Sequence, residues 1–551
     1  MRSSMSAVWN ELWNAHDKTK QLLRFAVPNS GNAERAQASE QSGTAKKAPP
    51  SYKRPQMIGL LLGPLFFFAV IFFYYPEGLS YEGRMVLATT LWVATWWITE
   101  AIPIPATSLL PLILLPLTQG LDGETAASSY GNPIVFLFLG GFLIAMAMEK
   151  WDLHKRIALN IISVVGTSTS RIVLGFMIAT GFLSMWVSNT AAVMMMLPIG
   201  SAIIYQASQA VKTSKQSMGE DGKKFEKMLV FAIGYAGTIG GLGTLIGTPP
   251  NIILAAMASS LFGVEISFGG WMLVAVPIVV ILLFSAWIYL TKIVFRINMK
   301  ELPGGKDLIL KEKGKLGSMS FEEKAVLVIF SFAAFMWVSR TFLWQADAVW
   351  QIIAIPGLSD TMIAVLAGVL LFLIPSLSKK GERLLTWEVS KDLPWGVLLL
   401  FGGGLAIAAG FTSSGLSQWI GDQLTVLEGF NIILIIIIST TLVLFLTEIT
   451  SNTATATMIL PVMASLALAL NMHPYAIMVP AAMAANCAFM LPVGTPPNAI
   501  IFATGKITIA DMVKTGFALN IFTLLLLILG VFTLVGPIWG LDLSVYPESW
   551  K

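Results

Sequence analysis

Long apolar segments, separated by short polar ones, recur along most of the chain. A bilayer core of about 30 Å needs about 20 apolar residues for one helical crossing, and a soluble core would not need so many such runs. The pattern therefore predicts an all-α polytopic protein embedded in a lipid bilayer. The runs cover residues 57–75, 84–99, 104–118, 133–148, 171–205, 228–262, 271–291, 323–339, 361–376, 394–411, 430–470, 475–505 and 516–540.

Loop charges orient these segments, because Lys and Arg concentrate on the cytoplasmic side. The basic N-terminal tail predicts a cytoplasmic N-terminus. Run 171–205 as one helix would be about 52 Å long, and the lysines after it lie on the side from which it entered. We therefore expect a re-entrant hairpin with its tip at 188–190. Run 430–470 is also too long for one crossing, and we expect its tip, 451–453, to enter from the opposite side.

This topology predicts about 11 transmembrane helices and two opposed re-entrant hairpins, arranged as an inverted repeat. We expect the protein in the plasma (inner) membrane, with its C-terminus outside. The expected parts are a cytoplasmic tail with a short amphipathic helix (1–55), a first repeat (56–296), a cytoplasmic linker (297–321), a second repeat (322–540) and an extracytoplasmic tail (541–551).

Two polar sequence motifs each occur twice within the apolar segments. "SNTAAVMMMLPI" begins at Ser188 and "SNTATATMILPV" at Ser451, and each is followed by "GTPPN", from Gly247 and from Gly494. Proline has no backbone N–H and breaks a helix interior, so we expect broken helices at 247–251 and 494–498. Secondary transporters use inverted repeats with interrupted helices and bind substrate near the midplane.

Helix ends at membrane depth have a defined chemistry. The helix that ends at a tip leaves carbonyl groups free, which suit a cation such as Na⁺. The helix that begins there leaves N–H groups free, which suit an anion. Neither tip contains Lys or Arg, so anion binding would depend on bound cations. A single SNT could be only a helix cap or a helix contact, but the duplication favours a binding site.

Other features narrow the function classes. The net charge of +4 comes from loop residues and does not indicate nucleic-acid binding, and the single cysteine excludes an intrachain disulfide. We find no metal-ligand cluster, no phosphate-binding loop, no nucleophile elbow and no cleavable signal peptide, and we expect no organic cofactor and no enzymatic activity. An intramembrane enzyme remains a remote alternative, although no histidine is placed to serve Ser188 or Ser451, and a membrane receptor is a third class.

At these motifs the chain resembles the divalent anion/Na⁺ symporter family, which includes sodium–dicarboxylate and sodium–citrate cotransporters. The resemblance covers roughly residues 55–540 and includes "WWITEAIPIPATSLLP" at 96–111 and "NCAFMLPVGTPPNAI" at 486–500. Asn486 stands where the family pattern has serine, and Thr450 where alanine is expected. The resemblance implies a homodimer whose protomers each have a scaffold domain and a transport domain that moves as an elevator.

The resemblance also implies ligand positions. The first Na⁺ site would use Ser184, Ser188, Asn189 and the carbonyl of Gly247. The second would use Thr447, Ser451, Asn452 and the carbonyls of Thr450 and Gly494. Substrate carboxylates would meet Asn189, Thr190, Thr248, Asn452, Thr453, Thr495 and Pro496.

We therefore expect Na⁺-coupled symport of C4-dicarboxylates such as succinate, malate and fumarate. The alternatives are Na⁺-coupled symport of citrate or sulfate and Na⁺-independent dicarboxylate exchange. The hydroxyls of Ser184 and Thr447 favour Na⁺ coupling over exchange. Glu448, inside an apolar run, is either part of the second cation site or a hydrogen-bonded structural acid.

Overall fold

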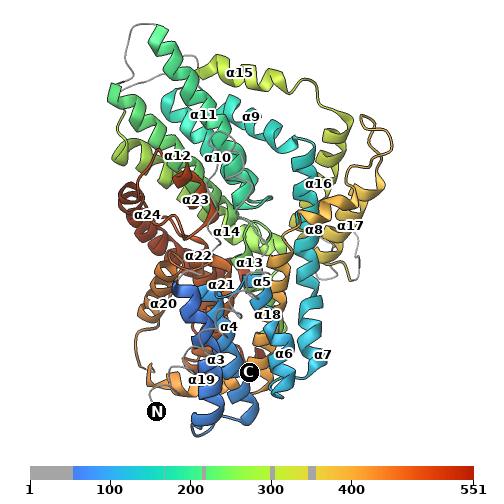
Figure 1. Ribbon diagram of the computed structural model, residues 1–551, viewed down its shortest axis with the longest axis vertical. Helices are drawn as coiled ribbons and strands as arrows, with labels where there is room; N and C mark the ends of the chain where they lie inside the picture. The colour runs from blue at the N-terminus through green and yellow to red at the C-terminus, as the bar shows by residue number, and fades with distance from the viewer. Residues whose placement is uncertain are drawn as a thin grey trace, which may run out of the picture. The chain divides into compact units, whose positions relative to one another are not determined.

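The computed structural model describes residues 54–550, except 167, 214–218, 298–304, 345–354, 356 and 428. The amphipathic helix expected in the N-terminal tail lies outside the described residues. Where the structure describes the chain, it consists of helices and connecting segments and has no β-strand (Figure 1). The predicted all-α fold is confirmed.

The helices of the first half run from α3 to α15. They are α3 (Arg54–Phe73), α4 (Tyr81–Thr99), α5 (Ile104–Thr107), α6 (Leu110–Leu117), α7 (Gly123–Ser128), η1 (Ser129–Gly131), α8 (Pro133–Lys150), α9 (Leu153–Val165), α10 (Thr169–Ser184), α11 (Asn189–Thr213), α12 (Gly219–Gly241), α13 (Pro249–Phe262), α14 (Phe268–Ile288), η2 (Tyr289–Val294) and α15 (Gly305–Lys315).

The second half begins at α16. Its helices are α16 (Phe321–Ser339), η3 (Arg340–Trp344), α17 (Asp360–Leu373), η4 (Trp387–Lys391), α18 (Trp395–Ser413), α19 (Leu416–Leu424), η5 (Thr425–Leu427), α20 (Ile432–Leu446), α21 (Asn452–Ala469), α22 (Pro474–Asn486), α23 (Pro496–Ala503), α24 (Ile509–Gly530), η6 (Val531–Val535), α25 (Gly536–Trp539) and η7 (Glu548–Trp550).

Polar residues at the helix starts explain many of these boundaries. Ser80, Ser267 and Ser359 accept hydrogen bonds from backbone N–H groups of the first turns of α4, α14 and α17. The side chains of Ser320 and Glu323 form a reciprocal capping box at the start of α16. Such caps satisfy N–H groups that have no partner inside the helix, so these polar residues mark where each apolar helix begins.

Several helices are suited to a lipid environment. By length and composition, seven of the described segments could cross a membrane, or eight if the bent pair Leu416–Leu427 and Ile432–Leu446 is one span. The seven are Arg54–Phe73, Gly123–Lys150, Phe268–Val294, Phe321–Trp344, Trp395–Ser413, Asn452–Ala469 and Ile509–Trp539. The expected count of about 11 crossings stays a prediction.

The order of helices repeats within the chain. The helix α8, which contains two consecutive glycines, corresponds to α18, and the short helix α9 corresponds to α19. The five helices that follow, α10 to α14, correspond to α20 to α24. The contacts repeat as well: α12 packs against α10, α11 and α14, and α22 packs against α20, α21 and α24. The internal duplication that the motifs indicated therefore extends over seven helices.

The two repeats also exchange contacts. The helix after the first "GTPPN" turn, α13, packs against α21 and α22 of the second repeat. Reciprocally, α23 packs against α11 and α12 of the first repeat, and Figure 1 shows α23 beside them. This exchange brings the four expected helix breaks into one region of the fold.

Candidate functional site

Both SNT phrases lie where one helix ends and the next begins. In the first repeat α10 ends at Ser184 and α11 begins at Asn189. In the second repeat α20 ends at Leu446 and α21 begins at Asn452. The chain is therefore non-helical over 185–188 and 447–451, whereas the other residues of the expected tips (189–190 and 452–453) already belong to α11 and α21. Because one helix ends and another starts at each break, carbonyl and N–H groups both become available there.

Both GTPPN phrases also follow a helix break. The helix α12 ends at Gly241 and α13 begins at Pro249, and α22 ends at Asn486 and α23 begins at Pro496. In each case the first proline of the motif starts the new helix, where its missing N–H costs no intrahelical hydrogen bond. The non-helical residues are 242–248 and 487–495, so the breaks lie mostly before the expected ranges 247–251 and 494–498, whose Pro-Pro-Asn residues already belong to α13 and α23.

Four polar groups converge at the first break, and we call them the first oxygen cluster. One of the two terminal atoms of the Asn189 amide, the oxygen or the nitrogen according to how the amide is turned, points into this cluster. It lies 2.7 Å from Ser184 Oγ and 3.2 Å from each of the carbonyl oxygens of Gly237 and Gly247. The Ser184 hydroxyl donates a hydrogen bond of 2.6 Å to the Gly237 carbonyl. Ser184 is fully buried. The cluster joins α10, α11, the end of α12 and the turn before α13.

The second oxygen cluster repeats this arrangement. The inward amide atom of Asn452 lies 2.7 Å from Thr447 Oγ1, 3.2 Å from the Ala485 carbonyl oxygen and 3.1 Å from the Gly494 carbonyl oxygen. The Thr447 hydroxyl donates a hydrogen bond of 2.6 Å to the Ala485 carbonyl. The correspondence of hydroxyl, amide and two carbonyls shows that the repeat extends to the placement of individual atoms.

The asparagine amides give these clusters two chemical states. With its nitrogen turned inward, each amide donates hydrogen bonds to the surrounding oxygens. With its oxygen turned inward, four oxygens face one another and repel unless a cation lies among them. Hydroxyl, amide and carbonyl oxygens are the ligands that hard cations take in proteins, so each cluster fits a small hard cation.

Two glycines allow the first cluster to close. A Cβ atom on Gly241 would lie 2.3 Å from Asn189 Oδ1, and one on Gly247 would lie 2.5 Å from the Gly241 carbonyl oxygen. Any larger residue would displace the amide or open the turn. The glycines are therefore required by close approach rather than by an unusual backbone torsion.

A buried asparagine holds each GTPPN turn in place. The Asn251 amide nitrogen donates to the carbonyls of Gly241 (3.0 Å), Leu242 (3.1 Å) and Thr244 (2.8 Å). The Asn498 amide nitrogen donates to the carbonyls of Ala488 and Leu491, both at 3.0 Å. Sequence reasoning did not single out these residues, although each is the last residue of a duplicated motif.

Glu448 anchors the turn of the second repeat. Its buried carboxylate accepts hydrogen bonds from the backbone N–H groups of Phe489 (2.8 Å), Met490 (3.0 Å) and Leu491 (3.0 Å), and from Asn520 Nδ2 (2.6 Å). Four donors compensate the burial of this acid. The geometry supports the structural role among the two considered for Glu448.

The first repeat has no acid at the corresponding place. There Thr244 is the anchor: its hydroxyl donates to the Met185 carbonyl and accepts from the Gly247 N–H at 3.0 Å. The two repeats thus fix equivalent turns with different chemistry, a neutral hydroxyl in one and a carboxylate in the other.

The other predicted site residues lie around the clusters. Ser188 is exposed and its Oγ accepts from the Ala191 N–H, while the Thr450 hydroxyl bonds the Leu446 carbonyl and Thr455. Their side chains do not enter the clusters. Ser451, Thr190 and Thr453 are half-buried, Thr248 and Thr495 are buried, and Pro496 is exposed. Sequence reasoning missed the carbonyls of Gly237 and Ala485.

The described histidine, cysteine and acidic side chains do not form a further metal-binding group. Among the described residues no group of three or more His, Cys, Asp or Glu could hold a metal ion. His154, in α9, pairs its Nδ1 with the Met148 carbonyl, and His473 caps the start of α22. Both histidines therefore have local structural partners.

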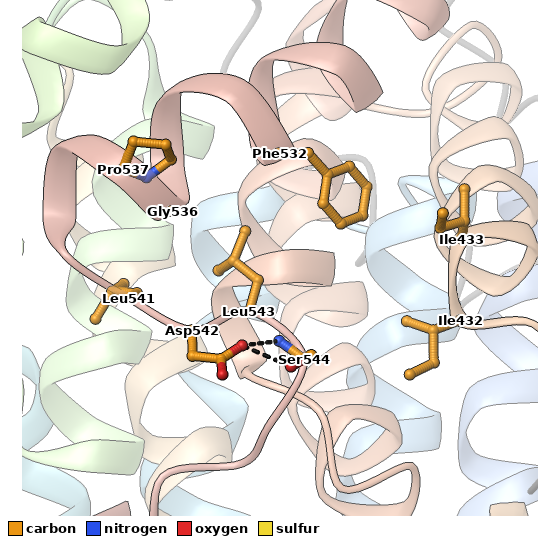
Figure 2. Close-up of a pocket in the computed structure, with 9 residues that line it drawn as sticks. All are labelled: Ile432, Ile433, Phe532, Gly536, Pro537, Leu541, Asp542, Leu543 and Ser544. Carbon is orange, nitrogen blue, oxygen red and sulfur yellow. Dashed lines mark hydrogen bonds between the residues drawn. The ribbon is translucent and has the colours of Figure 1, made fainter.

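An open pocket of about 650 Å³ lies elsewhere, between the start of α20 and the C-terminal segment. Figure 2 shows its lining, in which Ile432, Ile433 and Phe532 face the loop of Leu541–Ser544. The only acid in the lining, Asp542, accepts hydrogen bonds from Ser544. The lining contains none of the predicted site residues, so this pocket is not the site that the motifs indicate.

Comparisons with known proteins agree with the motifs. Residues 56–541 match the family described as "Sodium:sulfate symporter transmembrane region". The "Sodium-dependent dicarboxylate transporter SdcS" of Staphylococcus saprophyticus is 57% identical over 500 residues, which are 91% of this chain and 95% of the relative. The protein of the same name from Staphylococcus aureus strain USA300 is 54% identical over 506 residues, again 91% of this chain and 95% of the relative.

Solved structures share the fold at low sequence identity. The transporter MtrF of Neisseria gonorrhoeae superposes with a TM-score of 0.54 at 12% identity, covering 90% of this chain and 96% of MtrF. The YdaH transporter of Alcanivorax borkumensis gives a TM-score of 0.52 at 12% identity, covering 84% of this chain and all of YdaH. The match over 56–541 and the identity to the two relatives show that the chain belongs to the sodium:sulfate symporter family.

Proposed function

We propose that this protein is a Na⁺-coupled symporter of C4-dicarboxylates such as succinate, malate and fumarate. The observation that carries the proposal is the pair of matching oxygen clusters, one at each SNT break. The name of the 57% identical relative, a sodium-dependent dicarboxylate transporter, supports the same function.

Each cluster would hold one Na⁺ ion. The first ion would take Ser184, Asn189 and the carbonyls of Gly247 and Gly237, with Ser188 beside it. The second would take Thr447, Asn452 and the carbonyls of Gly494 and Ala485, with Ser451 and the Thr450 carbonyl beside it. Binding Na⁺ would turn both asparagine oxygens inward, because an amide nitrogen cannot coordinate a cation.

The anion would bind between the two breaks. The free N–H groups at the starts of α11 and α21, with Thr190 and Thr453, would receive its carboxylates, helped by the helix dipoles. Thr248, Thr495 and Pro496 at the starts of α13 and α23 would complete this site. Since none of these side chains is charged, two bound Na⁺ ions would supply the positive charge that a dianion needs, and this requirement couples the two movements.

We further propose the membrane architecture that the loop charges indicate: about 11 crossings, two opposed re-entrant hairpins, a cytoplasmic N-terminus and an outward C-terminus. The helices that bear the breaks, together with α14 and α24 (α10 to α14 and α20 to α24), would form a transport domain. It would move as an elevator against a scaffold that includes α8, α17 and α18, within a homodimer. The exchanged contacts of α13 with α21 and of α23 with α11 support one cohesive transport domain.

Uptake of labelled succinate by proteoliposomes tests this function. We expect accumulation with an inward Na⁺ gradient and little uptake when choline replaces Na⁺. Unlabelled malate and fumarate should compete strongly. Succinate uptake at full rate without Na⁺ would contradict the proposal and favour dicarboxylate exchange.

Citrate or sulfate is the second candidate substrate, because the description of the matching family names sulfate. In the same assay, stronger competition by citrate or sulfate than by malate would favour this candidate. The two clusters would then keep their role, and only the identity of the anion would change.

Substitution of the two asparagines tests the site. Asn189→Ala and Asn452→Ala each remove one amide from a cluster, so each should abolish Na⁺-driven uptake. Asn160→Ala, on α9, is a control because Asn160 belongs to neither cluster. Wild-type uptake by either cluster variant would contradict a site that both repeats share.

A further inference from the structure

One buried side chain joins the two repeats between the oxygen clusters. Asn486, the last residue of α22, is fully buried. Its Oδ1 accepts a hydrogen bond from Thr248 Oγ1 at 2.6 Å, and its Nδ2 donates to the Thr238 carbonyl at 2.9 Å. Both partners belong to the first repeat, whereas Asn486 belongs to the second.

The three residues of this hydrogen-bonded link are Thr238, Thr248 and Asn486. Each directly follows, in the sequence, a residue whose carbonyl belongs to a cluster. Thr238 follows Gly237 and Thr248 follows Gly247, whose carbonyls belong to the first cluster, and Asn486 follows Ala485, whose carbonyl belongs to the second. A carbonyl shares a planar peptide unit with the N–H of the next residue. A shift of any of these carbonyls therefore moves the residue that takes part in the link.

The backbone of Asn486 also contacts the second tip. In the orientation that turns Asn452 Oδ1 toward Thr447, the Asn452 amide nitrogen donates to the Asn486 carbonyl at 3.3 Å. This is the orientation that a cation requires. Asn486 thus contacts the second cluster through its backbone and the first repeat through its side chain.

The link is not repeated in the opposite direction. Thr495, the equivalent of Thr248, uses its Oγ1 to accept from the Asn498 N–H at the start of α23. Thr248 makes no such cap, and its hydroxyl is directed to Asn486 instead. A hydroxyl that could cap a helix is therefore committed to contact between the repeats.

We propose that Asn486 is a positioning residue that couples the two Na⁺ sites, so that occupation of one raises the affinity of the other. This proposal rests on the proposed function. A cation in the first cluster draws the carbonyls of Gly237 and Gly247 toward itself. The two hydrogen bonds of Asn486 transmit that shift to the end of α22, where the Ala485 carbonyl and Asn452 then adopt the arrangement that binds the second cation.

Binding of Na⁺ without anion tests the coupling separately from transport. Na⁺ titrations of the purified full-length protein, followed by calorimetry, should give a sigmoidal isotherm with a Hill coefficient of about 2 for two strongly coupled sites. Asn486→Ala and Thr248→Val should lower the coefficient to about 1. Both should raise the Na⁺ concentration at half-saturation, by about 10-fold for a typical coupling free energy.

Two further variants separate coupling from structural damage. Thr248→Ser keeps the hydroxyl and should restore the wild-type coefficient. Thr440→Val makes the same change as Thr248→Val at a buried hydroxyl that has no hydrogen-bond partner, and it should leave the isotherm unchanged. If Asn486→Ala does not fold, Thr248→Val and Thr248→Ser provide the decisive comparison.

The possible failures are distinguishable. A wild-type Hill coefficient of about 1, or a coefficient above 1 that persists in Thr248→Val, would overturn the coupling and leave Na⁺-driven transport intact. Wild-type protein that binds no Na⁺ and takes up succinate without Na⁺ would overturn the proposed function itself.

Discussion

At the scale of single residues, each cluster depends on an amide that can both donate and accept. Asn189 and Asn452 can hold the surrounding oxygens by donating hydrogen bonds, and the same side chains can bind a cation by turning the amide over. An aspartate in the same place could not donate hydrogen bonds to the surrounding oxygens, and an alanine could neither donate hydrogen bonds nor bind a cation. In the proposed function such a site would carry no fixed positive charge, and binding of the anion would therefore depend on Na⁺.

The cluster hydroxyls should set the affinity for Na⁺. Ser184→Ala and Thr447→Val each remove one oxygen ligand and the hydrogen bond to a cluster carbonyl. A hydrogen-bonding contact with a charged group contributes about 1.5–3 kcal/mol. We therefore expect the Na⁺ concentration for half-maximal succinate uptake to rise about 10-fold or more. Thr440→Val is the matched control, and an unchanged Na⁺ dependence in both cluster variants would contradict the ligand role.

Glu448 should contribute to stability as well as transport. In Glu448→Gln, the amide nitrogen of the new side chain would face backbone N–H groups that now donate to a carboxylate. Each buried donor left without a partner costs about 1–3 kcal/mol. We expect a lower melting temperature and loss of uptake.

Asp422→Asn is the control for Glu448, because Asp422 is exposed and exposed substitutions change stability by about 0.5 kcal/mol or less. A Glu448→Gln protein with wild-type melting and altered Na⁺ dependence would favour the alternative role, direct contact with the cation.

At the scale of helices, the breaks were predictable and the paths between them were not. Paired prolines and Ser-Asn-Thr phrases in overlong apolar runs identify the interruptions from residue type alone. The carbonyls of Gly237 and Ala485 belong to residues inside α12 and α22, and the small side chains of these residues give no sign that their carbonyls face a cluster. For this reason the two carbonyls were missed, whereas Ser184, Asn189, Thr447 and Asn452 carry side-chain oxygens that residue type alone reveals.

Close packing between helices gives a further prediction. A methyl group on Gly241 would lie 2.3 Å from Asn189 Oδ1, which is too close for the amide to remain in the first cluster. Gly241→Ala should therefore reduce Na⁺-driven uptake as severely as Asn189→Ala. Gly314→Ala is the control, because a Cβ atom there has no neighbour within 4 Å. Wild-type uptake by Gly241→Ala would mean that the amide is not needed where the structure places it.

At the scale of the whole molecule, the two repeats are not separable units. Since α13 packs against the second repeat and α23 against the first, each oxygen cluster is surrounded by helices of both repeats. The breaks can then form one site only if the exchanged helices stay together during transport. Loop charges and motif order predicted the duplication, whereas the exchange of contacts depends on the fold and has no sequence signal of its own.

The proposed elevator movement can be tested by tying α21, in the proposed transport domain, to α18, in the proposed scaffold. A Cβ atom on Gly404 would lie 3.6 Å from Thr457 Cβ, within the range of about 3.5–4.5 Å that disulfides require. In a Cys487→Ala background, Gly404→Cys with Thr457→Cys should lose uptake on oxidation and regain it on reduction, because the disulfide would prevent sliding.

A matched pair lies within the proposed scaffold, where a Cβ atom on Gly368 of α17 would be 3.8 Å from Leu143 Cβ of α8. A disulfide between Gly368→Cys and Leu143→Cys should leave uptake unaffected, because neither helix would move relative to the other. Equal uptake by the oxidised and reduced Gly404–Thr457 pair, with the disulfide verified by mass spectrometry, would exclude sliding of α21 along α18. Na⁺ and substrate would then have to cross by a local opening of the breaks.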